Sequence, residues 1–389
     1  MTKKWSSRLT FFAFVVLMVG LGSNDSLRGI FSTIFQEHFS LTTTQLGLIV
    51  TASYIGNLVF LLVGGNLSTR FSKKRVLQVL ILIWMAALAL FAFTSNYTVL
   101  LIGMALALGS STLLNTTMNL ITPLLFATAP GFFVNFLFFT QEIGTSGSQY
   151  ILGSHADGFA FWQHTNLVLL ILGAVAFVLL LFCNVPEEAA DPADTPAQKG
   201  GYDWRIIVPY VLVFGFYFIA EHGVMNWMVA YGVDGLGLPQ ALAAKYLSVF
   251  FGGMMIGRLC LSPLVDKLGA LKSLAAFGGV SCVLYLIGSL GGAATMPVWA
   301  ISGLSFSILY PTLVMSIRLY FPAQQVSGAA GTILSIASLA DILFNVGFGK
   351  LVDMAGYAVS IRVLPLSALA FFIVFMLFTK FCKPTQKLK

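Results

Sequence analysis

The chain has 389 residues, of which 58% are apolar and only 9% are Asp, Glu, Lys or Arg, and its formal net charge is +7. The surface of a water-soluble domain needs several times that density of charge, so a soluble fold is excluded. Nucleic acid is not expected as a partner, because no soluble domain is left to carry a basic face. The sequence predicts an all-α integral membrane protein with the lipid bilayer as its main solvent.

Twelve stretches are long and apolar enough to cross the hydrocarbon core as helices, which takes about 20 residues each. Short loops separate most of them, so neighbouring helices are expected to be antiparallel. In chain order, the predicted spans are 9–35, 45–67, 75–95, 97–126, 132–156, 163–183, 204–232, 240–264, 270–290, 294–320, 326–352 and 358–381.

Lys and Arg predict the orientation, because loops rich in these residues stay in the cytoplasm. They gather in the two tails and in the loops after spans 2, 6 and 8, which all lie on one side if there are twelve spans. We therefore expect both termini in the cytoplasm and the protein in the inner or plasma membrane. The residues concerned are Lys3, Lys4, Arg8, Arg70, Lys73, Lys74, Arg75, Lys199, Arg205, Lys267, Lys272, Lys380, Lys383, Lys387 and Lys389.

The only long polar stretch, 184–203, is rich in Pro, Gly and acidic residues and is typical of a flexible linker. It separates two predicted domains of six spans each, 1–183 and 204–389. The domains match at an offset of 197 residues, which indicates an internal duplication. The matching positions are Leu41 with Leu238, Gly56 with Gly253, Leu67 with Leu264 and Arg70 with Lys267.

The loops that share this offset also carry a family signature. GGNLSTRFSKKR, residues 64–75, resembles the G-x-L-x-D-R-x-G-R-[KR] loop of the major facilitator superfamily, and SPLVDKLG follows span 8. The resemblance implies the major facilitator fold, with two pseudo-symmetric six-helix bundles and a cytoplasmic gate built on an ion pair. Arg70, Asp266 and Lys267 are the gate candidates, although Thr69 replaces the family's Asp. Alternatively, the cations only set the topology.

Three further segments resemble the fucose/glucose–proton symporter branch of that superfamily. They are NDSLRGIFSTIFQEHFSLTTTQLGLIVTASYIG at 24–56, YLSVFFGGMMIGR at 246–258 and SFSILYPTLVMSI at 305–317. The resemblance implies inward movement of a monosaccharide with protons. It also implies a solute site between the halves, lined by spans 1, 4, 7 and 10.

Span 1 contains three polar residues, Asn24, Asp25 and Arg28. A carboxylate inside the bilayer costs on the order of 3 kcal/mol or more, so Asp25 should face a cavity or a partner. Arg28 is three residues on and shares its helix face, so one interpretation is a local pair that only holds span 1. The other is proton coupling, because Asp25 matches the acid of the symporter branch. Asn24 is a candidate solute contact.

Span 4 contains Asn115, Thr116 and Asn119, and span 5 contains Gln141. Amides and hydroxyls both donate and accept hydrogen bonds, which suits a sugar or another polyol. The alternative is hydrogen bonding between helices, worth roughly 0.6 kcal/mol each. Relatives often have an acid at the position of Asn115. Its absence here means either that coupling uses another carboxylate or that the protein is not proton-coupled.

Span 7 contains Glu221, His222, Asn226 and Trp227. His222 is equivalent to Asp25 at the 197-residue offset and titrates near neutral pH, so Glu221 and His222 are further proton-coupling candidates. A packing role for His222 is the alternative. Asn226 is a candidate solute contact, and Trp227 either stacks on a sugar ring or anchors the helix at the membrane interface.

Charged residues of other spans are interpreted mainly as structural pairs that hold or switch the helix contacts. Arg258 is expected to pair with Glu221 or Asp341. In span 10, Pro311 predicts a helix break beside Tyr310, a further candidate solute contact. The remaining candidates for gating or charge pairing are Arg28, Glu142 and Asn345.

The leading hypothesis is therefore a secondary transporter of a small polar solute, a monosaccharide or similar, by alternating access and proton symport. It is not expected to be an enzyme, to need a cofactor or metal, or to be other than a monomer, and its four cysteines show no metal spacing. One alternative is proton-driven export of lipophilic or drug-like compounds, since Phe and Met suit an apolar, adaptable cavity. A remote alternative is a receptor or scaffold that transports nothing.

Overall fold

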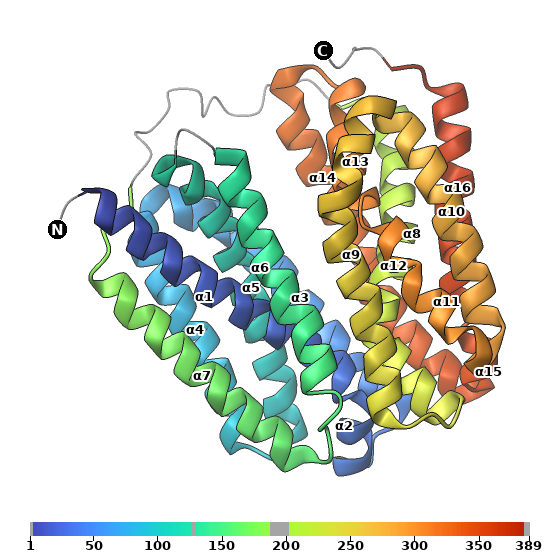
Figure 1. The fold of residues 1–389 in the computed structure, drawn as a ribbon, viewed down its shortest axis with the longest axis horizontal. Helices are drawn as coiled ribbons and strands as arrows, with labels where there is room; N and C mark the ends of the chain where they lie inside the picture. The colour runs from blue at the N-terminus through green and yellow to red at the C-terminus, as the bar shows by residue number, and fades with distance from the viewer. Residues whose placement is uncertain (1–2, 127–129, 187–201, 385–389) are drawn as a thin grey trace. The chain divides into compact units, whose positions relative to one another are not determined.

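The computed structural model describes residues 3–126, 130–186 and 202–384, without the side chains of 3–5, 63–70, 130–132, 135, 266, 323–324 and 327. Within these ranges the regular secondary structure is helical. The chain divides into two compact units, Met1–Asp191 and Pro192–Lys389 (Figure 1). The all-α fold class is confirmed, whereas most of the predicted linker falls on residues 187–201, outside the described part.

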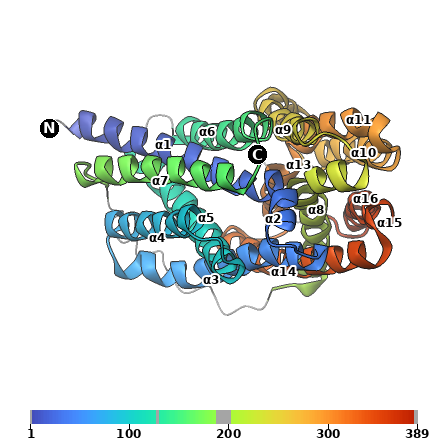
Figure 2. The ribbon, with the colours of Figure 1, turned by 90° about the horizontal axis from the view of Figure 1, so that it is seen from below.

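Unit 1 contains six long helices and one short one. Its helices α1, α6 and α7 lie on one side and α3, α4 and α5 on the other (Figure 2), with α1 packed on α6 and α3 packed on α5. The helices are α1 (Lys3–Ile30), α2 (Ser32–His38), α3 (Thr43–Arg70), α4 (Lys73–Phe93), α5 (Tyr97–Leu125), α6 (Pro130–Ile151) and α7 (Phe159–Leu181).

Unit 2 repeats this arrangement, with α8, α14 and α16 on one side and α9 to α13 on the other (Figure 2). Its elements are α8 (Trp204–Ala230), the π-helical turn η1 (Tyr231–Gly235), α9 (Gln240–Leu268), α10 (Ala270–Leu290), the 3₁₀ turn η2 (Gly292–Thr295), α11 (Met296–Ile301), α12 (Gly303–Phe306), α13 (Leu309–Ser316), the 3₁₀ turn η3 (Ile317–Leu319), α14 (Ala323–Ala355), α15 (Tyr357–Ser360) and α16 (Val363–Phe381).

The two units follow the offset that their sequences share. Helices α3 and α9 begin 197 residues apart, and α4 and α10 both begin and end 197 residues apart. In unit 1, α3 packs on α5, and in unit 2, α9 packs on α11 and α12, which stand at the equivalent place. The packing thus has the pseudo-symmetry that the duplication predicts.

Eleven helical stretches of the described residues are long and apolar enough to cross a membrane. The predicted fifth span corresponds to α6, whose residues 130–132 and 135 have no described side chains, so the apolar length of this helix stays a prediction. The polar residues of α6 face neighbours inside unit 1, as described below.

Three predicted spans are interrupted in the structure, and the twelfth is divided at residues 361–362 into α15 and α16. The first span ends as α1 at Ile30 and resumes as α2 after Phe31, where the hydroxyl of Ser32 donates to the carbonyl of Gly29 at 2.8 Å. Such a side-chain bond to the preceding turn competes with the helical backbone pattern. The tenth span, predicted at 294–320, corresponds to the apolar stretch Gly292–Leu319, which is divided into α11, α12 and α13.

The division of the tenth span has a local cause. Pro311 is the third residue of α13, within the first turn, where a helix does not need the backbone N–H that proline lacks. Ser307 and Ile308, directly before α13, are not α-helical. The predicted break beside Tyr310 is confirmed, and it lies on the N-terminal side of the proline.

The backbones of helices α1 and α6 are in contact, and this contact fixes how the polar residues of the two helices align along the helix axes. A Cβ atom added to Gly22 would lie 2.0 Å from the carbonyl oxygen of Gln141, and one added to Gly144 would lie 2.1 Å from that of Val19. The hydroxyl of Thr145 donates to the carbonyl of Gly22 at 3.2 Å. Only glycine allows this approach, which brings Gln141 next to the turn of α1 that contains the polar residues Asn24, Asp25 and Arg28.

One cation of the family-like loop has a structural role inside unit 1. The Lys74 ammonium donates to the carbonyl oxygens of Leu181 at 3.0 Å and Cys183 at 2.8 Å, at the C-terminal end of α7. A cation at this end satisfies carbonyls that have no helical partner and complements the helix dipole. Lys74 thus joins the start of α4 to the end of α7, in addition to any effect on topology.

Candidate functional site

The polar turn of unit 1 centres on Asp25 in α1. The hydroxyl of Ser111, from α5, donates to Asp25 Oδ2 at 3.4 Å. Arg28 is 6% exposed and interacts electrostatically with Asp25, but its guanidinium lies over the ring of Tyr54, 5.5 Å from the centroid. Asp25 therefore meets a neutral hydroxyl, and the local pair with Arg28 is not a direct ion pair.

A chain of amides joins α5 to α6 in the same unit. The Asn119 side chain donates to Asn115 Oδ1 at 2.6 Å, and Asn115 in turn donates to Gln141 Oε1 at 2.6 Å. All three residues are partly exposed. Thr116 points elsewhere, since it is exposed and donates to the carbonyl of Thr112 in its own helix. The structure thus brings Asn115, Asn119 and Gln141 together and leaves Thr116 out.

Asn24 is used in packing between helices. It is 7% exposed, and its Oδ1 accepts a hydrogen bond from the indole N–H of Trp84, in α4, at 3.2 Å. Trp84 is fully buried. Nothing in the sequence singled out Trp84, whereas Ser111 could have been found, because it precedes Asn115 by four residues and shares its helix face.

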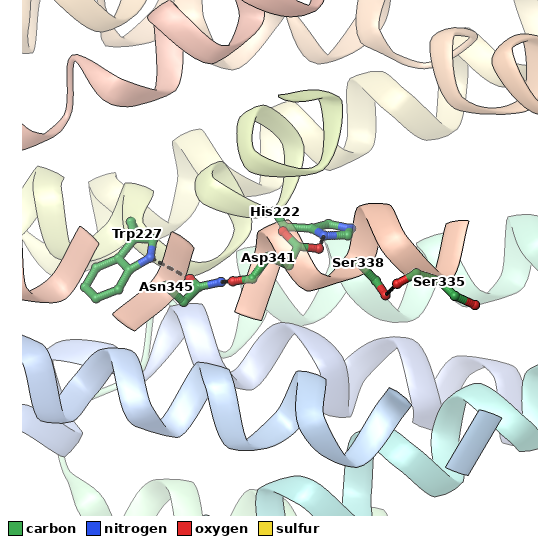
Figure 3. Close-up of polar contacts among 6 residues, drawn as sticks. All are labelled: His222, Trp227, Ser335, Ser338, Asp341 and Asn345. Atoms are coloured by element: carbon green, nitrogen blue, oxygen red, sulfur yellow. Dashed lines mark hydrogen bonds and ion pairs between the residues drawn. The ribbon is translucent and has the colours of Figure 1, made fainter. Parts of the chain in front are cut away.

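In unit 2, the side chains of His222 and Asp341 form a contact between α8 and α14 that is an ion pair when the imidazole is protonated. His222 Nδ1 lies 2.6 Å from Asp341 Oδ2, and the exposed fractions of the two side chains are 26% and 2% (Figure 3). The imidazole also stacks on Phe218, with 5.3 Å between the ring centres. From the sequence, Glu221 was considered as a neighbour of His222 in a proton relay, and Arg258 was expected to pair with Glu221 or Asp341. In the structure, His222 contacts an acid 119 residues away in the chain.

Asn345, four residues after Asp341, extends this contact along α14. Its side chain donates to the backbone carbonyl of Asp341 at 2.8 Å and accepts from the indole N–H of Trp227 at 2.8 Å (Figure 3). Trp227 is fully buried and packs on Phe348. Its indole thus has a partner between two helices of unit 2, which favours a packing role over stacking on a sugar ring or anchoring at the interface.

Glu221 and Arg258 belong to a second cluster of unit 2. Glu221 is 9% exposed, and its charge and that of Arg258 both act on the hydroxyls of Tyr217 and Tyr310. The rings of Tyr217 and Tyr310 stack with 6.1 Å between centres. Glu221 and His222 therefore point to different neighbours, as expected for adjacent residues of a helix.

The other candidates are placed as follows. Asn226 is 2% exposed in α8, and Glu142 is partly exposed in α6, where each has an interaction partner. Lys267 is exposed at the end of α9. The side chains of the gate candidates Arg70 and Asp266 lie outside the described part, so the cytoplasmic gate stays a prediction.

No group of three or more His, Cys, Asp or Glu side chains that could hold a metal ion occurs within the described ranges. All four cysteines are free thiols. The polar clusters described above are built instead from single carboxylates, amides, hydroxyls, one imidazole and the guanidinium groups of Arg28 and Arg258. Such groups suit the binding of protons and of an uncharged or singly charged solute.

Comparison with known proteins agrees with this arrangement. A model of the Major Facilitator Superfamily matches residues 10–343. The chain belongs to this superfamily. It is therefore a multi-pass membrane protein and a secondary transporter, and not an enzyme.

Two relatives and one solved structure are similar to this chain over most of its length. The chain is 23% identical to the L-fucose-proton symporter of Escherichia coli, over 93% of this chain and 90% of the symporter. It is 26% identical to a glucose/galactose transporter of Brucella abortus, over 82% and 81% of the two chains. The crystal structure of a D-xylose-proton symporter superposes with a TM-score of 0.77 at 15% identity, covering 99% of each chain. The transporter is thus similar to the fucose-symporter branch, as its sequence segments predicted.

Proposed function

We propose that this transporter moves a monosaccharide or a similarly small polar solute together with protons, by alternating access. The similarity to the L-fucose-proton symporter and to a glucose/galactose transporter supports this class of solute. The observation that carries the proposal is Asp25, a carboxylate inside α1 whose contact is the neutral hydroxyl of Ser111.

A neutral hydroxyl suits a carboxyl group that gains and loses a proton. The Ser111 hydroxyl can donate to the Asp25 carboxylate and accept from the protonated acid, so each state has a hydrogen-bond partner. A direct ion pair would stabilise only the charged state. Asn115 stands where related transporters often have an acid, so Asp25 is the leading coupling residue of unit 1, with His222 and Glu221 as candidates in unit 2.

The solute contacts that we propose are polar side chains that can donate and accept hydrogen bonds. Asn115, Asn119 and Gln141 offer a continuous set of amide groups in unit 1, and one lone acceptor, Asn119 Oδ1, is buried without a partner among the described residues. Asn226 and Tyr310 are the corresponding candidates in unit 2. We further propose that both termini are cytoplasmic, that the membrane is the inner or plasma membrane, and that the protein acts as a monomer.

The test is uptake of labelled L-fucose and D-galactose into liposomes that contain the purified transporter, with and without an inward proton gradient. Uptake by the wild type should depend on the gradient and acidify the lumen. Asp25→Asn should lose gradient-driven accumulation and keep exchange of solute across the membrane. Asp157→Asn, an exposed acid of a loop, is the matched control and should behave as the wild type. Gradient-driven accumulation by Asp25→Asn would remove Asp25 from this role.

A further inference from the structure

Arg28 is a buried charged residue that has no role in the proton coupling proposed above. It lies in the last turn of α1 with 6% of its surface exposed, and its Nε is buried without a hydrogen-bond partner among the described residues. The guanidinium faces the ring of Tyr54, and its charge acts on Asp25. A guanidinium has five N–H donors and stays charged at any physiological pH, so burial without acceptors is costly.

The surroundings of Arg28 suit one kind of acceptor. The guanidinium carbon of Arg28 lies over the Tyr54 ring, 5.5 Å from its centroid, and this cation–π contact provides no acceptor oxygen for the N–H groups. A carboxylate matches the edge of a guanidinium with two parallel hydrogen bonds. We propose that Arg28 binds a carboxylate of the solute, so that the substrate class is an acidic monosaccharide or a similar hydroxy acid. This inference rests on the proposed function and narrows its solute.

Asp25 then links the solute to the proton by charge balance. In the empty site, the Asp25 carboxylate offsets the charge of Arg28 from three residues away. When a solute carboxylate binds to Arg28, Asp25 takes up one proton from the solution, and the net charge of the site stays at zero. Neither partner binds well alone, because a second anion or an uncompensated cation would be left in a buried site.

Other ionisable groups surround α1, on α2, α3, α5, α6 and α7. Among the described residues, Arg28 is the charged group whose effect on Asp25 is evident, so the proton balance concerns these two residues. The other groups are Glu37, His38, Tyr54, Tyr97, Glu142, Tyr150 and His164.

A purely structural role for Arg28 makes a different prediction. A cation in the last turn of α1 also stabilises the helix dipole. Replacement would then lower stability and leave the preference for acidic or neutral solutes unchanged. The experiment therefore measures solute preference separately from folding.

The experiment uses the purified full chain and two solute pairs that differ by a carboxylate, D-galacturonate with D-galactose and D-gluconate with D-glucose. Binding is measured by the shift in thermal stability and by proton uptake in weak buffer. The wild type should prefer an acid over its neutral partner and take up about one proton per acid bound. Arg28→Gln should weaken binding of that acid by about 10- to 100-fold, as for lost charge-assisted hydrogen bonds. The affinity of Arg28→Lys for the acid should lie between those of the wild type and Arg28→Gln, because lysine keeps the positive charge but cannot form two parallel hydrogen bonds. Arg205→Gln, an exposed arginine, is the matched control and should leave binding unchanged.

Two outcomes would overturn the inference. One is a wild type that binds the neutral sugars as tightly as the acids, without proton uptake on acid binding. The other is an Arg28→Gln variant that keeps full affinity for the acid. If Arg28→Gln does not fold, the wild-type preference, the proton count and Arg28→Lys decide. Proton-driven uptake of the neutral sugars alone leaves the proposed function standing, whereas no proton-driven uptake of any of the four solutes overturns that function.

Discussion

Positions 25 and 222 are equivalent in the two units, yet their surroundings differ in kind. In unit 1, the Asp25 carboxylate meets the hydroxyl of Ser111, and the nearby cation faces a tyrosine ring. In unit 2, the His222 imidazole meets the buried carboxylate of Asp341 at 2.6 Å. Asp25 can therefore change its charge without breaking an ion pair between helices, whereas a change at His222 alters the contact of α8 with α14.

The largest effect is expected where this contact is broken. His222→Ala removes the contact of the buried Asp341 Oδ2, and Asp341 Oδ1 already has no hydrogen-bond partner among the described residues. Loss of one partner of a buried pair costs about 3–5 kcal/mol in unfolding free energy. Thermal unfolding of the detergent-solubilised protein would measure it, and His222→Ala with Asp341→Leu should recover most of the loss. A single variant as stable as the wild type would mean that the pair does not hold α8 on α14.

Asp25→Asn is the counterpart in unit 1 and sharpens the comparison. It removes a charge that has no direct ion pair, so the unfolding temperature should change little while proton-driven uptake is lost. A large loss of stability in this variant would show that the two sites are alike after all.

The next largest loss of stability is expected from replacing glycines at helix contacts. A Cβ atom at Gly56 of α3 would lie 2.0 Å from the carbonyl oxygen of Ala105, whereas one at the equivalent Gly253 of α9 would lie 3.0 Å from the backbone nitrogen of Leu304. Gly56→Ala should therefore cost about 1–3 kcal/mol, as overpacking does, and Gly253→Ala less. Unfolding temperatures of the two variants would rank the two helix crossings, and the reverse order would contradict the difference in packing.

The smallest effects are expected at the buried indoles. Among the described side chains, each unit has one tryptophan N–H bound to an asparagine, Trp227 with Asn345 at 2.8 Å and Trp84 with Asn24 at 3.2 Å. Trp227→Phe should cost about 1 kcal/mol from the lost hydrogen bond, in addition to a packing loss common to both variants. Trp84→Phe should cost less, because its bond is longer. Equal losses would mean that the bond lengths carry no energetic difference.

The regular parts of the fold were predictable because apolar length and loop charge act locally. The ninth span was predicted at 270–290, and α10 has the same bounds. The division of the tenth span was only half predictable. Pro311 marks a break in any sequence, but the interruption at Ser302 and Ser307 depends on serine hydroxyls that donate to backbone carbonyls of the preceding turn.

The polar contacts were less predictable, because they join residues far apart in the chain. Asn115 with Asn119 follows from helical spacing, and their grouping was predicted from the sequence. His222 with Asp341 and Asn24 with Trp84 depend on which helices pack together, which neither spacing nor composition determines. Adjacent residues of a helix point about 100° apart, so the neighbouring position of Glu221 in the sequence does not identify the contact of His222.

The close approach of α1 and α6 also limits how the two halves could diverge after duplication. At the 197-residue offset, the counterpart of Asp341 is Gly144, where a Cβ atom would collide with the carbonyl oxygen of Val19 at 2.1 Å. An acid at position 144 would force α1 away from α6. No single substitution there can give unit 1 the ion pair of unit 2, so the asymmetry of the two halves is maintained by backbone packing as well as by selection on the charges themselves.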